Sequence, residues 1–245
     1  MLSLTEKERQ RYHRQMLMPG WGEEGQRRLK QARAFVAGAG GLGSPLSIYL
    51  AVAGVGEITL VDQDVVDLSN LNRQILHGEE DVGRPKAVSA EETLTALNRD
   101  ITIRALHQPI TGENVHRLVG EAQIIVDCMD NFPTRFLLNR AALDLGIPLV
   151  HGAIWGLEGR ITFIDPGRTP CLRCLFPEAP PAEVFPVAGV TPAVIACLQA
   201  TEVLKYLTGI GELLRNRLLL YNGLEMEFQT LKIQRDPRCP ECGSF

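Results

Sequence analysis

The sequence predicts an α/β protein with a Rossmann-like, mostly parallel, doubly wound sheet and antiparallel strands toward the C-terminus. Two observations carry this prediction. Short apolar stretches alternate with helical patterns through the first half of the 245 residues, the order that builds a parallel sheet covered on both faces. A glycine-rich turn at residues 38–43 follows the first apolar stretch and fits G-x-G-x-x-G, a turn that joins strand to helix in such folds.

Apolar patterning and helix-starting residues define the elements of the first half. Thr5 and Glu8 form a capping box that opens a short helix. Ser44 and Pro45 are the expected N-cap and first residue of the helix after the glycine turn. The predicted strands are 34–37, 57–61, 101–106, 124–127 and one that begins at 149, and the predicted helices are 44–53, 85–97, 113–119 and 133–145.

The pattern changes after Gly152. Alternation predicts a half-exposed strand within 156–167, and closely spaced prolines predict a loop at 175–190. The chain shows no internal repeat and no low-complexity linker, so one domain is predicted. The later elements expected are a helix at 191–207 and antiparallel strands at 217–223 and 224–235.

Composition excludes several classes of function. The net charge of −4 lacks the basic excess that a dedicated nucleic-acid-binding protein needs. No apolar run reaches the length of a membrane span, and the first residues contain no signal-peptide core. We therefore expect a cytoplasmic protein without a membrane partner. In a reducing compartment the six cysteines are expected to be metal ligands, core residues or nucleophiles rather than disulfides.

The glycine turn and a following acidic residue predict a nucleotide site. Glycine lets the backbone approach phosphate, and the next helix offers free N–H groups and the positive end of its dipole. Asp62 ends the second predicted strand and can accept both hydroxyls of a ribose. These roles suit NAD and ATP equally, and a tight strand–helix junction is a third interpretation. The glycines are Gly38, Gly40, Gly41 and Gly43.

Charged residues beyond Asp62 favour a triphosphate. A dehydrogenase binds pyrophosphate mostly with backbone amides, whereas ATP carries about two more negative charges and loses pyrophosphate, which calls for fixed cations and a carboxylate for Mg²⁺. Arg73 and Lys86 are candidate cations and Asp130 is a candidate carboxylate. Taken singly, the cations are ordinary surface charges and Asp130 is a helix N-cap. Their convergence at the carboxyl ends of predicted strands favours a functional site.

Four cysteines form two C-x-x-C pairs. Each pair can hold one edge of a Zn²⁺ ion, and together they complete a closed tetrahedral Cys₄ site. The long gap between the pairs suits a zinc clip that joins the tail to the domain, and the alternative is a redox role for one pair. The remaining cysteines, Cys128 and Cys197, lie in apolar settings and are expected in the core. The four candidate ligands are Cys171, Cys174, Cys239 and Cys242.

The motifs of the chain resemble, in order, those of the ThiF/HesA/MoeB adenylyltransferases, which are similar to the adenylating domain of ubiquitin-activating enzymes. The resemblance covers about residues 8–243 and is greatest to the molybdopterin-synthase type, with the thiamine-pathway type next. The matching stretches are RYHRQ, GAGGLGSP, LVDQDVVDLSNLNRQ, GRPKA, DCMDN, HGA with EGRIT, PCLRCLF, AGVTPAVI and CPECG.

This resemblance implies a homodimeric enzyme that uses ATP and Mg²⁺. It would adenylate the C-terminal glycine carboxylate of a small ubiquitin-like sulfur carrier that ends in Gly-Gly, release pyrophosphate, and serve molybdopterin or related sulfur-transfer biosynthesis. Within one domain, 1–245, it implies an N-terminal helical segment at 1–30, a nucleotide-binding core at 31–152, and a carrier-binding, crossover-loop and zinc-clip part at 153–245.

The resemblance also implies a role for each matching residue. The glycines and Asp62 would contact the nucleotide. Asp130 would hold Mg²⁺ with Asn131 nearby, Arg14 would reach the phosphates of the partner subunit, and the four paired cysteines would bind zinc. The phosphate ligands would be Ser69, Asn70, Leu71, Asn72, Arg73 and Lys86.

One stretch departs from the pattern of the family. Several relatives carry a cysteine just before AGV that can bond to the carrier or handle sulfur, whereas this chain has Phe185-Pro186-Val187 there. It is therefore expected to stop at the acyl-adenylate. The alternatives are the thiamine-pathway enzyme, an enzyme that activates a carboxylate on modified tRNA (a threonylcarbamoyladenosine dehydratase type), a dehydrogenase, and a non-catalytic module that docks ubiquitin-like proteins.

Overall fold

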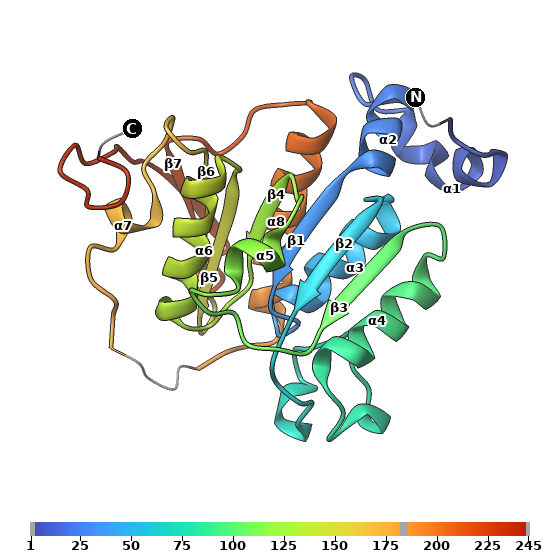
Figure 1. Ribbon diagram of the computed structural model, residues 1–245, viewed down its shortest axis with the longest axis horizontal. Helices are drawn as coiled ribbons and strands as arrows, with labels where there is room; N and C mark the ends of the chain where they lie inside the picture. Colours follow the sequence, from blue (N-terminus) through green and yellow to red (C-terminus); the bar gives the residue numbers. More distant parts are fainter. Residues whose placement is uncertain (1–2, 182–185, 244–245) are drawn as a thin grey trace.

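The computed structural model describes residues 3–181 and 186–243 and contains an eight-stranded sheet in the order β3-β2-β1-β4-β5-β6-β7-β8 (Figure 1). Strands β1 to β5 are parallel, and β6, β7 and β8 each run antiparallel to the strand before them. This order confirms the predicted fold class. The strands are β1 Arg33–Ala37, β2 Glu57–Val61, β3 Thr102–Leu106, β4 Ile124–Asp127, β5 Leu149–Trp155, β6 Glu158–Ile164, β7 Arg217–Asn222 and β8 Glu227–Lys232.

Helices cover both faces of the parallel part (Figure 1). One face packs on α3, α4 and α8, and the other packs on α5, α6 and α7. Alternation along β1 produces this division, because Val36 faces the first set and Phe35 faces the second. The helices are α1 Glu6–Met16, α2 Gly22–Gln31, α3 Gly43–Ala53, α4 Lys86–Leu97, α5 Val115–Val119, α6 Phe132–Leu145, α7 Leu172–Leu175 and α8 Val190–Thr208, with 3₁₀ turns η1 Leu68–Asn70 and η2 Glu79–Asp81.

Two local predictions are wrong. Ser44 is not an N-cap, because α3 begins one residue earlier and the Ser44 hydroxyl donates to the Ala39 carbonyl at 3.0 Å. Strand β6 is largely buried rather than half-exposed, because Ile161 and Phe163 on one face pack into the core beneath α8. The Thr5–Glu8 capping box is confirmed. Phe185, in the stretch that departs from the family pattern, lies outside the described residues.

The strand ends define where a site can form. Because β1, β2 and β4 are parallel neighbours, the segments that follow Ala37, Val61 and Asp127 meet at one edge of the sheet. Ligands of open α/β sheets bind at such an edge. None of the helices in the described part of the chain is long and apolar enough to cross a membrane.

Candidate functional site

The glycine turn packs too tightly for side chains at two positions. Gly38 has φ 101°, and a Cβ there would lie 2.9 Å from the Cys128 carbonyl oxygen. A Cβ on Gly43 would lie 1.8 Å from the Gly38 carbonyl oxygen. Glycine at both positions lets α3 start directly after β1 and brings the turn against the end of β4. The N–H groups at the start of α3 therefore lie at the carboxyl edge of the sheet.

Asp62 fixes the backbone of this turn. One carboxylate oxygen accepts from the Ala39 amide at 2.8 Å and the other from the Asp64 amide at 2.8 Å. Burial raises the pKa of the Asp62 carboxyl, while the Ala39 and Asp64 amides favour its ionised form. Each oxygen retains a further lone pair, so the carboxylate can still accept from a ribose hydroxyl.

The Ala39 carbonyl is held from the other side by a residue that the sequence did not indicate. His77 Nε2 lies 3.2 Å from this oxygen, and His77 Nδ1 lies 2.9 Å from the Ser89 hydroxyl. A carbonyl only accepts, so Nε2 carries the proton. Burial lowers the pKa of His77. The imidazole thus links the glycine turn to α4, and no local sequence pattern marks it.

Arg73 lies beside the glycine turn, as predicted. A Cβ on Gly41 would lie 3.5 Å from Arg73 Cδ and 3.3 Å from Pro192 Cγ at the start of α8. The Arg73 guanidinium donates to the Ser69 carbonyl at 2.9 Å and the Asn72 side-chain oxygen at 2.8 Å. Backbone and amide oxygens therefore orient this cation without neutralising it.

The rest of the 69–73 segment is a compact turn. The Asn70 side-chain oxygen accepts from the Asp67 amide at 3.2 Å, and Asp67 accepts from the Ser69 amide at 2.8 Å. Ser69 and Asn72 are exposed, and Leu71 is half-buried. The amide and hydroxyl groups that the sequence proposed for phosphates thus lie on one short segment next to Gly41.

Lys86 and Arg84 have different surroundings although they are two residues apart. The Lys86 side chain is only 7% exposed, and its Nζ lies 3.0 Å from a carboxylate oxygen of Asp64, which is 58% exposed. Arg84 instead pairs with Asp81 and Glu92. Lys86 therefore belongs to the carboxyl edge, and Arg84 belongs to an ion-pair cluster with the buried Asp81 and the exposed Glu92. The sequence did not identify Asp64 as the counter-ion of Lys86.

Asp130 keeps its carboxylate available. Asn131, not Asp130, is the N-cap of α6, because its side-chain oxygen accepts from the Thr134 amide at 2.9 Å. The helix-cap interpretation of Asp130 is therefore wrong. Asp130 is exposed, and its carboxylate accepts from the side-chain nitrogen Nδ2 of Asn131 at 3.4 Å. It follows Met129, whose sulfur would lie 3.5 Å from a Cβ on Gly38.

A buried charged cluster beneath Asp130 was also missed. Asp127 and His151 are fully buried, and His151 Nδ1 lies 2.7 Å from Asp127 Oδ2. Arg135 Nε lies 3.6 Å from the same oxygen and donates to the Met129 carbonyl at 3.1 Å. Asp127 Oδ1 accepts from the Met129 amide at 3.0 Å. Both backbone groups of Met129 are thereby fixed, which sets the direction in which Asp130 leaves β4.

We expect His151 to make the fold acid-sensitive. Burial lowers the pKa of His151, while Asp127 raises it and Arg135 and Arg160 lower it. The unfolded chain therefore binds more protons than the folded chain below about pH 6.5, so stability is full above that pH and falls as the pH falls. His151→Gln should reduce the slope of unfolding free energy against pH by up to about 1.4 kcal/mol per pH unit.

Urea unfolding at a series of pH values measures this slope. His13→Gln is the matched control, because His13 is exposed on α1. Its slope should equal that of the unmutated chain. The same slope for His151→Gln as for the unmutated chain would contradict the role given to burial.

The two C-x-x-C pairs come together as predicted. The four sulfur atoms lie within 4.8 Å of one another, with 3.6 Å between Cys171 and Cys239 and 3.4 Å between Cys174 and Cys242. A tetrahedral zinc site with Zn–S bonds of about 2.3 Å would separate its sulfurs by about 3.8 Å. Four thiols at nearly this spacing fit a closed zinc site.

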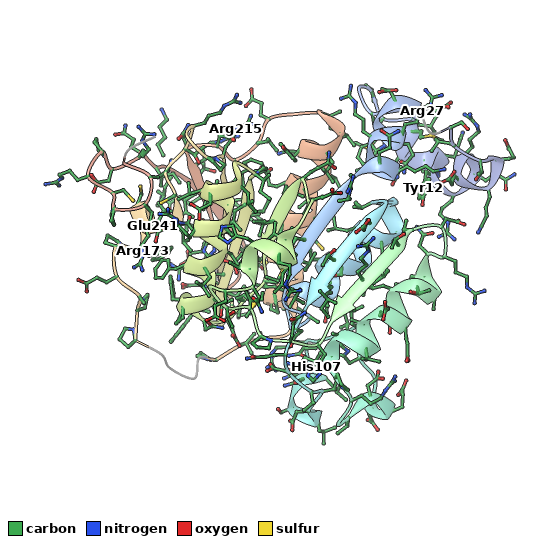
Figure 2. The ribbon with its side chains drawn as sticks, in the orientation of Figure 1. Tyr12, Arg27, His107, Arg173, Arg215 and Glu241 are labelled. Carbon is green, nitrogen blue, oxygen red and sulfur yellow. The ribbon has the colours of Figure 1, made fainter. Side chains whose placement is uncertain are left out.

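The surroundings of the cluster also tie the tail to the domain. Glu241 pairs with Arg173 at 3.2 Å (Figure 2). It also accepts from Asn139 on α6. The Asn139 side-chain oxygen accepts from the Leu172 amide at 2.8 Å. Burial raises the pKa of Cys171 to about 11, so metal binding there would release a proton.

The remaining two cysteines were predicted to lie in the core, and the structure confirms this for Cys128. Cys128 is buried at the end of β4, and burial raises its pKa well above the usual range. Cys197 is only partly buried on α8. Neither joins the four-cysteine cluster.

Arg14 is not brought to this edge within one chain. It is exposed on α1, which packs where β2 and β3 begin. The neighbouring residues show this packing, since Gln15 donates to the Ala53 carbonyl at 2.8 Å and the hydroxyl of Tyr12 accepts from Asn98 at 2.9 Å. Figures 1 and 2 place α1 and Tyr12 far from the sheet edge that carries η1 and η2. Within one chain, Arg14 therefore does not contribute to the nucleotide edge.

Comparison with known proteins gives likenesses over almost the whole chain. The ThiF family profile matches residues 12–241. The chain is 47% identical over 248 residues to a SAMP-activating enzyme E1 of Haloferax volcanii, covering 99% of this chain and 92% of that protein. It is 48% identical over 250 residues to a sulfur carrier protein adenylyltransferase of Thermus thermophilus, covering 98% and 92%. Among solved structures, E. coli MccB with ATP gives a TM-score of 0.84 at 26% identity, covering 98% of this chain and 75% of that chain.

Proposed function

The chain belongs to the ThiF family, and on this premise we propose that it adenylates the C-terminal glycine carboxylate of a small ubiquitin-like sulfur carrier with ATP. One observation supports this most strongly. The glycine turn, Asp62, Arg73, Lys86 and the Asp130 segment converge on one edge of the sheet. That edge offers helix N–H groups, two cations and a free carboxylate, which are the groups that a triphosphate with Mg²⁺ requires.

The chemistry is a substitution at the α-phosphate. A carboxylate oxygen of the carrier forms a bond to the α-phosphorus, and the bond from that phosphorus to the pyrophosphate oxygen breaks. The terminal carboxylate is already ionised at pH 7, so no general base is needed. The protein contributes alignment and neutralisation of charge. Arg73 and Lys86 would bind the phosphates, and Asp62 would bind the ribose.

Mg²⁺ fits the Asp130 carboxylate in this proposal. Carboxylate oxygens are preferred ligands of Mg²⁺, which binds with one or two carboxylates plus substrate phosphates. The ion would neutralise the leaving pyrophosphate. Asp127 and Arg135, through Met129, would keep the Asp130 carboxylate directed toward the crevice. The Asn131 side chain would continue to cap α6.

The other parts of the chain receive supporting roles in the proposal. Residues 1–30 would pack across to a second copy, 31–152 would bind the nucleotide, and 153–245 would carry the carrier-binding surface and a structural zinc clip on the four paired cysteines. The reducing cytoplasm would keep these cysteines as thiols. Because 175–190 contains no cysteine, the acyl-adenylate would be the final product. The pathway that we propose is molybdopterin synthesis, and thiamine synthesis is the alternative.

We expect the active unit to be a homodimer in which Arg14 serves the partner's site. Arg14→Ala and Arg73→Ala should each be nearly inactive alone. A mixture that exchanges subunits should regain about a quarter of the activity, because half of randomly paired dimers are mixed and each has one intact site. Steady-state pyrophosphate release measures this. Absence of recovery, with mixed dimers verified by mass, would contradict sharing between subunits.

The proposed product itself can be detected. The chain is incubated with ATP, Mg²⁺ and a sulfur carrier that ends in Gly-Gly, and intact-mass spectrometry should show AMP attached to the carrier. A carrier with an amidated C-terminus is the control, because it lacks the attacking carboxylate. AMP on neither carrier, while the chain binds ATP, would contradict the proposed function and favour a non-catalytic or tRNA-directed role.

A further inference from the structure

The antiparallel part of the sheet carries a groove of about 460 Å³ that the proposed chemistry does not use. The register places one residue from each of four strands in a row across its floor. Ala153 on β5 faces Arg160 on β6, Arg160 faces Leu220 on β7, and Leu220 faces Gln229 on β8. Arg160 is the cation of this row and lies on the side of it toward the parallel strands.

Arg160 makes no ion pair within the described part of the chain, although Glu158 on the same strand is close enough to act on its charge. Its guanidinium lies 5.2 Å from the centre of the Phe176 ring, and no ion pair or hydrogen bond of its side chain is found among these residues. Burial lowers the pKa of Arg160, the nearby Arg135 lowers it further, and Glu158 partly offsets both effects. A partly buried guanidinium stays charged and is costly to leave without acceptors. The guanidinium can therefore donate to carbonyl oxygens or to a carboxylate that enters the groove, whose lining also includes Glu158, Glu225 and Glu227.

Strand β5 links the groove to the strand that carries the Asp130 segment. His151 pairs with Asp127 of β4, and Ala153, two residues further along β5, pairs with Arg160. Arg135 lies between the two regions, because it donates to the Met129 carbonyl at 3.1 Å and to the Gly152 carbonyl at 3.4 Å. A chain lying in the groove beside Arg160 is thus directed toward Asp130.

A Gly-Gly tail can be recognised only through its backbone. It has no side chains, so its acceptors are carbonyl oxygens and the terminal carboxylate. Arginine presents five N–H donors and no acceptor, and its fork binds such oxygens in pairs. Two extended residues span about 7 Å, so a tail held near Arg160 can place its terminus further along the edge.

We propose that Arg160 binds the C-terminal tail of the carrier protein and directs it from the groove toward the nucleotide. This assignment rests on the proposed function. It gives the chain a binding residue for the extended Gly-Gly terminus that is separate from the phosphate ligands. A purely structural Arg160, held by Phe176 alone, is the competing account.

The test separates tail binding from folding. Arg160→Gln removes the charge and keeps similar length, Arg160→Lys keeps the charge without the fork, and Arg168→Gln is the control because the Arg168 side chain is 75% exposed. Each is assayed by pyrophosphate exchange with a carrier that the unmutated chain uses. Arg160→Gln should raise KM for the carrier about 10–100-fold and leave KM for ATP unchanged. The KM of Arg160→Lys for the carrier should lie between those of Arg160→Gln and the unmutated chain. The KM of Arg168→Gln should equal that of the unmutated chain.

A truncated carrier allows a double-mutant cycle between Arg160 and the terminal glycines of the carrier. Direct binding is measured for the full-length carrier and for the same carrier without its last two glycines. Arg160→Gln should weaken binding of the full-length carrier only. An unchanged KM, or equal weakening of both carriers, would overturn the assignment, and Arg160→Lys decides the matter if the glutamine variant does not fold. Absence of exchange by the unmutated chain with every carrier would overturn the proposed function and this assignment together. That failure is seen in the unmutated chain, whereas failure of the assignment alone is seen only when the Arg160 variants are compared with it.

Discussion

Lys86→Ala is expected to slow carboxylate adenylation by about 10²–10³-fold, or about 2.7–4 kcal/mol of barrier, as the loss of one preorganised donor does in other enzymes. The lysine side chain is 7% exposed, and in the described structure its ion pair is with Asp64, whose side chain is 58% exposed. A phosphate at this edge can therefore replace Asp64 with little rearrangement. ATP-dependent pyrophosphate release with saturating carrier measures the effect.

Arg84→Gln is the matched control for this prediction. Arg84 is a cation two residues before α4, but it is already paired with the buried Asp81 and the exposed Glu92. Its loss should change the rate less than about twofold, since its guanidinium is bound by these two carboxylates and is not available to a phosphate. If Lys86→Ala retained near-normal turnover with an unchanged melting temperature, or if Arg84→Gln lost as much activity, the phosphate-binding role of Lys86 would be contradicted.

Cys239→Ser is expected to abolish zinc binding and to release the C-terminal tail from the domain. A structural zinc site in small domains contributes on the order of 10 kcal/mol, and here the four ligands join two segments far apart in the sequence. We expect about one zinc per chain in the unmutated protein and close to none in the variant, with a lower melting temperature and faster proteolysis of the tail.

Cys197→Ser is the control for the zinc prediction, because Cys197 lies on α8 outside the cluster. Zinc content is measured by elemental analysis and the tail by limited proteolysis. Equal zinc content in Cys239→Ser and the unmutated chain would contradict the Cys₄ site. Zinc loss without any change in melting temperature or proteolysis would contradict its structural role.

The features that could be predicted from the sequence were local ones. The strand–helix alternation, the glycine turn and each C-x-x-C pair depend on spacing within a few residues, and the structure places them as expected. Parallel pairing then fixes which strand ends meet. This is why Asp62 and the Asp130 segment could be assigned to the same edge.

The features that were missed depend on contacts between distant residues. His77 reaches Ala39 across 38 positions, Lys86 reaches Asp64 across 22, and His151 reaches Asp127 across 24. No periodicity encodes such pairs. Local competition explains the wrong assignments, since Asn131 rather than Asp130 caps α6 and the Ser44 hydroxyl bonds back to Ala39.

ATP–pyrophosphate exchange tests the central claim most directly. The purified chain is given ATP, Mg²⁺ and labelled pyrophosphate, alone and with each of several sulfur carriers that end in a free Gly-Gly. Reversible carboxylate adenylation predicts exchange that requires a carrier, that occurs with one carrier above the others, and that disappears when that carrier lacks its C-terminal glycine. No exchange with any carrier, from a chain that binds ATP, would contradict the account.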